Sequence, residues 1–211
     1  MPRQNRVNPF GDLIATVSYG TFMGNRGVLH DKNGNLTRKR WTHTHWIACV
    51  LEFKDSKEKP RSTMSPGYYT ELFFLDEATA LAAGHRPCAL CRREAFNRFK
   101  EAWINGNAHL DLPKFVGVAE IDRILQRERA TDDGGKVTFE AVLKDLPNGT
   151  MVILPNETNT PGLVWKERIY PWSFDGYREP VKFQLTDKVQ VLTPASTVNA
   201  LKFGFIPEVS I

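Results

Sequence analysis

Apolar residues recur at helical spacing in two stretches near the middle of the chain, residues 92–103 and 119–130. The apolar positions are Phe96, Phe99 and Trp103 in the first stretch and Ile121, Ile124 and Leu125 in the second. Side chains three, four or seven positions apart share one face of an α-helix. Both stretches are therefore predicted to be amphipathic helices that bury one face.

Shorter segments rich in β-branched and aromatic residues flank these helices, and turn residues separate them. The predicted strands cover residues 12–23, 45–53, 68–75, 150–154, 162–172 and 188–193, and short helices are expected over 77–83, 138–146 and 194–204. Asp76 is the expected N-cap of the helix at 77–83, with Gly84 as its stop, and Thr138 is the expected cap of the helix at 138–146.

These elements predict an α+β protein. The sequence TDDGG at 131–135 is the clearest break in the pattern. We place a boundary there, between a first domain of residues 1–130 and a small β-rich domain of residues 131–211 with flanking helices.

Charge and composition narrow the class of protein. The chain has 211 residues and a net charge of +4, and residues 1–110 carry 16 Lys and Arg against 10 Asp and Glu. A basic first half suits a polyanionic partner. No apolar run resembles a signal peptide or a membrane span, and three cysteines are too few for a secreted disulfide framework. We expect a cytoplasmic protein that does not associate with membranes.

The candidate chemistry lies in the cysteines. Cys88 and Cys91 form a C-x₂-C pair, and His45 and Cys49 form an H-x₃-C pair. Zinc sites take four N or S ligands, commonly as two local pairs, so these residues predict a closed structural zinc site. His43 could replace His45, and His85 could also reach the ion. A redox pair of cysteines and inert buried thiols remain alternatives.

The stretch FFLDEATALAAGHRPCALCRRE resembles the second half of the zinc-binding N-terminal domain of Ada, the bacterial DNA-alkylation repair protein. The matching positions are residues 80–84, 86–88 and Cys91. Related small Ada-like modules carry H-x₃-C as their first ligand pair, which corresponds here to His45 and Cys49. The resemblance covers roughly residues 20–95, and the whole chain is similar to uncharacterised bacterial proteins that carry this module.

The resemblance also implies a difference in chemistry. In Ada, the first cysteine of the first pair accepts a methyl group from a DNA phosphotriester, and His45 stands at that position here. A zinc-bound imidazole lacks the nucleophilicity of a thiolate. We therefore expect a structural metal site without methyl-acceptor activity and assign no catalytic residue.

Six basic residues and one tryptophan surround the expected site and are candidate contacts to DNA or RNA: Arg38, Lys39, Arg40, Trp41, Arg86, Arg92 and Arg93. Arginines beside aromatic rings suit phosphates and stacked bases, although the same arginines could bond carboxylates and carbonyls around the metal. Two alternative functions stay open. One is a zinc-dependent hydrolase or nuclease with an open metal position. The other is a protein-interaction module that uses the aromatic cluster at 165–177, which is otherwise expected to be core.

Overall fold

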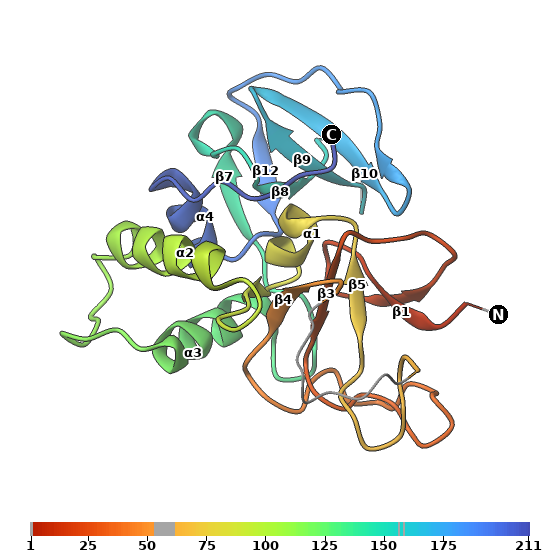
Figure 1. Ribbon diagram of the computed structural model, residues 1–211. Coiled ribbons are helices and arrows are strands. Elements are labelled where there is room, and N and C mark those ends of the chain that lie inside the picture. The colour runs from red at the N-terminus through yellow and green to blue at the C-terminus, as the bar shows by residue number, and fades with distance from the viewer. Residues whose placement is uncertain (1, 53–61, 156, 158) are drawn as a thin grey trace.

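The computed structural model describes residues 2–52, 62–155, 157 and 159–211. Within these residues the chain forms four α-helices and two six-stranded sheets, which confirms the α+β prediction. Figure 1 shows the first sheet, from the N-terminal part of the chain, below the second sheet, with helices α2, α3 and α4 gathered along one side.

The first sheet has the strand order β2-β1-β5-β3-β4-β6. Its strands are β1 (Gln4–Val7), β2 (Leu13–Ala15), β3 (Phe22–Asn25), β4 (Ile47–Val50), β5 (Leu72–Phe74) and β6 (Arg86–Pro87). Neighbours are antiparallel except for the pairs β1–β5 and β4–β6, which are parallel. The strands predicted at 12–23, 45–53 and 68–75 are confirmed in shorter form, and residues 53–61 lie outside the described chain.

The second sheet is antiparallel throughout, in the order β11-β10-β9-β8-β12-β7. Its strands are β7 (Phe139–Val142), β8 (Met151–Ile153), β9 (Pro161–Trp165), β10 (Arg168–Ser173), β11 (Gly176–Tyr177) and β12 (Lys188–Val191). Lys166 and Glu167 both have positive φ and make the tight turn between β9 and β10, as two-residue hairpins require.

The helix predicted at 138–146 is wrong. Residues 139–142 form the edge strand β7, and only a 3₁₀ turn, Leu143–Asp145, follows. Every residue of β7 is paired with β12, so tertiary pairing overrides a local sequence that also suits a helix.

The predicted helices elsewhere are confirmed. They are α1 (Glu77–Ala82), α2 (Arg93–Gly106), α3 (Val118–Arg129) and α4 (Ala195–Lys202). Asp76 caps α1 by accepting a hydrogen bond from the Thr79 amide (2.8 Å), and Gly84 follows the helix with φ of 89°.

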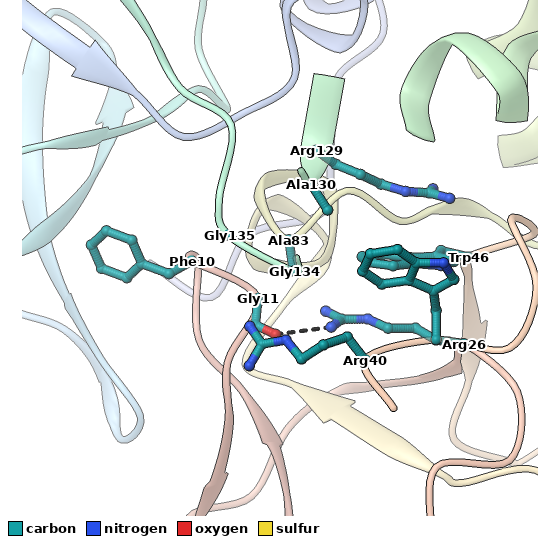
Figure 2. Close-up of a pocket in the computed structure, with 11 residues that line it drawn as sticks. Phe10, Gly11, Arg26, Arg40, Trp46, Ala83, Arg129, Ala130, Gly134 and Gly135 are labelled. Atoms are coloured by element: carbon teal, nitrogen blue, oxygen red, sulfur yellow. Dashed lines mark hydrogen bonds between the residues drawn. The ribbon is translucent and has the colours of Figure 1, made fainter. Parts of the chain in front are cut away.

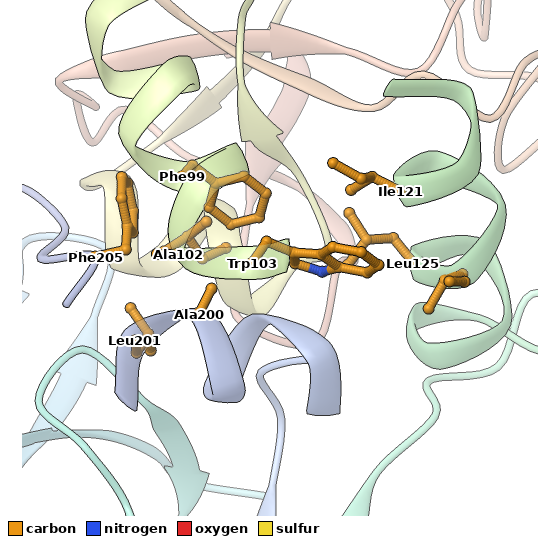
Figure 3. Close-up of a cluster of buried hydrophobic side chains, with 10 residues drawn as sticks. Phe99, Ala102, Trp103, Ile121, Leu125, Ala200, Leu201 and Phe205 are labelled. Atoms are coloured by element: carbon orange, nitrogen blue, oxygen red, sulfur yellow. The ribbon is translucent and has the colours of Figure 1, made fainter. Parts of the chain in front are cut away.

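The apolar faces of α2 and α3 meet those of α1 and α4 in one core, shown in Figure 3. Trp103 and Phe99 are fully buried there, between Ile121 and Leu125 of α3 and Leu201 of α4. Residues 131–135 lie in the chain between the strands of the first sheet and those of the second, and α4, which follows them, completes the helical core formed with α1, α2 and α3.

The end of the chain also returns to the first region. Phe205 packs edge-on against Phe99, with ring centroids 5.3 Å apart. The Glu208 amide donates to the Glu77 carboxylate (3.0 Å), and the Ser210 amide donates to Asp76 (3.1 Å). Residues 205–210 thus bind across the start of α1 and the face of α2.

The aromatic cluster at 165–177 packs against α1, as expected for core residues. The Trp172 indole donates to Thr79 (3.0 Å), and the Tyr177 hydroxyl donates to Asp76 (2.8 Å). These bonds join β10 and β11 to the helix that precedes the cysteine pair. Among the described residues, none of the helices has the length and apolar character of a membrane span.

Candidate metal centre

Three sulfur atoms from two distant segments lie together. Cys49, Cys88 and Cys91 are free, and their Sγ atoms all lie within 4.8 Å of one another. A tetrahedral zinc–thiolate site with Zn–S bonds of about 2.3 Å places its sulfurs roughly 3.8 Å apart. The observed cluster is therefore close to the geometry that a single metal ion needs.

The sheet and a helix start position these sulfurs. Cys49 lies in β4, and Cys88 follows β6, the strand that runs parallel to β4. The Cys88 amide donates to the Ala48 carbonyl (2.9 Å), which holds the two cysteines side by side. Cys91 comes from the turn before α2, so one ion would fasten the sheet edge to that helix.

Backbone amides point at the sulfurs. The Leu90 amide donates to the Cys88 Sγ (3.4 Å), and the amides of Cys91 and Val50 donate to the sulfurs of Cys88 and Cys91 respectively. Hydrogen bonds from Cys49 and Cys91 lower the pKa of Cys88 to about 2, whereas the same cluster raises the pKa of Cys49. The pKa of Cys91 is also raised, so the cluster favours a thiolate at Cys88 and thiols at the other two cysteines, whose protons a bound metal would displace.

His45 does not join the three sulfurs. Among the described residues, the group that can hold a metal contains only the cysteines. The His45 Nδ1 instead lies 2.7 Å from the Asp122 carboxylate of α3, and its side chain is 58% exposed.

The other two candidate histidines also have partners elsewhere. The His43 Nε2 lies 3.2 Å from the Asn25 side-chain oxygen. His85 is buried, accepts a hydrogen bond from Arg26 (3.3 Å) and packs against Phe74 and Trp46. Burial and the cations Arg26 and Arg129 lower the pKa of His85 well below its usual value, so this imidazole is neutral.

No known protein-family profile matches the chain, and comparisons with curated proteins and with solved structures find no match. The resemblance to Ada-like domains therefore rests on the motif residues alone and stays a prediction.

The seven basic and aromatic candidates for nucleic-acid contact fall into two groups. Arg86 and Arg92 are buried: Arg86 makes two hydrogen bonds to Asp122 (2.7 and 2.8 Å), and Arg92 binds Glu77 and Glu208. Both arginines therefore bind carboxylates, which is the alternative to nucleic-acid contact that the sequence analysis gave for them. The remaining candidates lie at the surface, with the cations exposed and the indole half-buried: Arg38, Lys39, Arg40, Trp41 and Arg93.

Asp122 is a residue of the site that sequence reasoning missed. Its side chain is 1% exposed and accepts from both Arg86 and His45. It lies beside Ile121 on α3 and shares the buried face of that helix with Leu125 and Arg129. The sequence did carry a signal for it: Asp122 and Arg129 lie on an otherwise apolar helix face. A charged residue that is buried needs a partner of opposite charge, so this pattern predicts an ion pair.

Proposed function

We propose that the protein binds one zinc ion through Cys49, Cys88 and Cys91, and that a separate surface segment, residues 38–41, associates with nucleic acid. The observation that carries the proposal is the convergence of three sulfurs from two segments, with amides directed at them. Thiolates are soft ligands, and clusters of them in a reducing compartment select zinc over magnesium or calcium.

The metal has a structural role in this proposal. Cys49 belongs to a sheet strand, and Cys91 lies two residues before α2, so the ion ties the sheet edge to the helical core. Two of the three sulfurs are buried, which limits access by a bulky methyl donor. Together with a histidine at the position of the Ada methyl acceptor, this supports a centre without methyl-transfer activity.

The three cysteines supply three ligands, and the identity of the fourth ligand decides between two functions of the centre. If His45 moves to the ion, the site closes and is structural. If water takes the fourth position, the ion could activate it for hydrolysis. A groove of about 370 Å³ next to the centre offers space for a substrate of this second candidate function: Val50 and Arg92, the chain neighbours of Cys49 and Cys91, line it, whereas the three cysteines do not.

Metal analysis and cobalt substitution test the centre. The purified full chain should contain one zinc, and Cys88→Ser and Cys91→Ser should each lower that content strongly. Co²⁺ bound by three sulfurs and one nitrogen differs in its absorption spectrum from Co²⁺ bound by three sulfurs and water. His45→Ala should change the spectrum if the site is closed, with His43→Ala as the matched control. A chain without bound metal would refute the proposed centre.

Exposed cations support the association with nucleic acid. Arg38, Lys39 and Arg40 are consecutive and exposed, and Trp41 follows them in the same surface segment. Phosphates pair with such cations, and an aromatic ring can stack on a base. The two buried arginines, Arg86 and Arg92, are not part of this proposed surface.

Fluorescence anisotropy with labelled single-stranded and duplex DNA and with RNA tests this surface. Affinity should fall steeply with salt, and replacing Arg38, Lys39 and Arg40 by Gln should lower the salt slope by about one unit per lost phosphate contact. The control replaces three exposed cations of the second region, Lys166, Arg168 and Lys182, by Gln. If both triple variants weaken binding equally, the interaction depends only on the net charge of the protein, and the proposal of a specific surface at residues 38–41 is refuted.

A further inference from the structure

A second cluster of unusual side chains lies apart from the cysteines, around a cavity of about 10 Å³. The cavity lies where the first sheet, the end of α3 and the turn at 131–135 meet (Figure 2). Its wall includes Gly11, Arg26, Arg40 and Arg129. A space of this size holds one water-sized group, such as a single oxygen atom.

Arg26 supplies a buried donor without a partner. Its side chain is 2% exposed, its Nη1 donates to the Gly11 carbonyl (2.9 Å), and its Nε donates to His85. The Nη2 atom has no hydrogen-bond partner among the described residues. A buried N–H group without an acceptor is costly, so this donor favours a ligand with an atom that can accept from it.

Gly11 keeps the space near this donor free. A Cβ built on Gly11 would lie 3.3 Å from the Arg26 Nη2, and the φ of this glycine is 90°, which side-chain-bearing residues rarely adopt. The glycine therefore leaves room for a group beside the guanidinium, where any larger residue would crowd it.

The charges around the cavity are unbalanced. Arg26 and Arg129 are both buried and lie over the ring of Trp46, each with its guanidinium carbon 4.0 Å from a ring centroid. Figure 2 shows the indole between the two arginines. The Lys136 ammonium donates to the Ala82 carbonyl in the same region, and Arg40 stands at the exposed side.

Carboxylates offset only part of this charge. Asp12 is bound to Arg40 (2.9 Å), and Asp122, which acts on Arg129, is already held by Arg86. Burial together with Arg26 and Arg129 lowers the pKa of Lys136 to about 7, and burial lowers that of Arg129 to about 9. A water molecule could accept from Arg26, but it would leave the excess positive charge unchanged. An anion would both accept the hydrogen bond from Arg26 and offset the excess positive charge.

We propose that this cavity is a phosphate-binding site, in which one phosphate oxygen accepts from the Arg26 Nη2 and Arg40 pairs with the part of the group that stays outside. The planar guanidinium matches phosphate geometry and makes strong charge-assisted hydrogen bonds. The phosphate comes either from free phosphate or from the backbone or end of a nucleic acid. The site requires neither zinc nor the exposed cations at 38 and 39.

Isothermal titration of the full chain with inorganic phosphate, in a buffer free of chloride and other oxyanions, tests the proposal. Saturable binding of one phosphate is expected. Arg40→Gln should weaken it about tenfold, the usual size of one charged hydrogen bond. Lys32→Gln removes an exposed cation outside the cavity wall and is the matched control.

Arg26→Met should abolish binding, with circular dichroism as the check on folding. If that variant does not fold, the comparison of Arg40→Gln with Lys32→Gln decides. Absence of saturable binding at millimolar phosphate, or equal weakening in both variants, overturns the site.

A second titration, with short oligonucleotides that carry or lack a 5′-phosphate, identifies the source. Displacement of bound phosphate only by the phosphorylated oligonucleotide assigns the site to a terminal phosphate. Displacement by both assigns it to the nucleic-acid backbone, and displacement by neither assigns it to free phosphate.

Discussion

The cysteine cluster and the cavity beside Trp46 are opposite in charge and are built on the same two chain segments. On the first segment, Trp46 of the cavity directly precedes β4, and Cys49 of the cluster lies within that strand. On the second segment, Ala83 of the cavity precedes β6, and Cys88 of the cluster directly follows it. One site gathers thiols and favours a cation, and the other gathers arginines and favours an anion. Paired strands can therefore present two unrelated ligand sites at their two ends.

Loss of the metal should have the largest effect. Removing zinc with a chelator, or introducing Cys88→Ser, should lower the Tm by about 10 °C, because several kcal/mol of local stabilisation are lost and each kcal/mol shifts Tm by about 2–4 °C in a chain of this size. Thermal unfolding followed by circular dichroism measures the shift. If the two sites are independent, phosphate titration of the chelated protein should still show binding. An unchanged Tm would mean that the cysteines hold no structural ion.

Asp122→Asn should have an effect of similar size. It removes the carboxylate that binds Arg86 and His45 and leaves a buried guanidinium without its counter-charge, at a cost of about 3–5 kcal/mol. Urea unfolding measures the change. Glu120→Gln is the matched control, because its pair with Arg123 on the same helix is exposed and should contribute less than about 1 kcal/mol. Similar losses of unfolding free energy in both variants would show that Asp122 stabilises the fold no more than an exposed carboxylate does.

A third prediction is a pH dependence at the cavity. Lys136 has a folded pKa of about 7 against an ordinary value of 10.5. Between these pH values the unfolded chain holds a proton that the folded chain has released, so stability should rise as the pH is raised from 7 toward 10. Lys136→Met should remove this part of the rise, as the difference between the two unfolding curves measured across that range. Saturating phosphate should reduce the rise in the natural chain. Parallel curves for both proteins would exclude Lys136 as its source.

The two sites also differ in how far the sequence reveals them. C-x₂-C is a local pattern, and it predicts the sulfur pair because the chemistry of the ligands restricts their spacing. Arg26 and Arg129 are more than a hundred residues apart, and each resembles an ordinary surface arginine until the fold places both over Trp46. The sequence also predicts His45 as the fourth ligand, and spacing alone does not reveal that the fold offers this imidazole a second partner, the Asp122 carboxylate of α3.

The same limit applies to the fold. Helices α2 and α3 could be predicted because their own side chains repeat with helical period, and burial of Phe99 and Leu125 follows from that repeat. The segment at 139–142 could not, because its state depends on β12, almost fifty residues later. Local periodicity predicts elements, whereas long-range pairing and charge compensation come only with the complete fold.

The return of residues 205–210 to α1 and α2 has a consequence for biosynthesis. Phe205 and Glu208 complete a core and a set of ion pairs whose other members, Phe99, Glu77 and Arg92, are translated more than a hundred residues earlier. While the ribosome still holds residues 205–210, the face of α2 that they cover stays open. The nascent first region therefore reaches its final packing only after residues 205–210 have left the ribosome, and until then it offers an apolar surface that chaperones can bind.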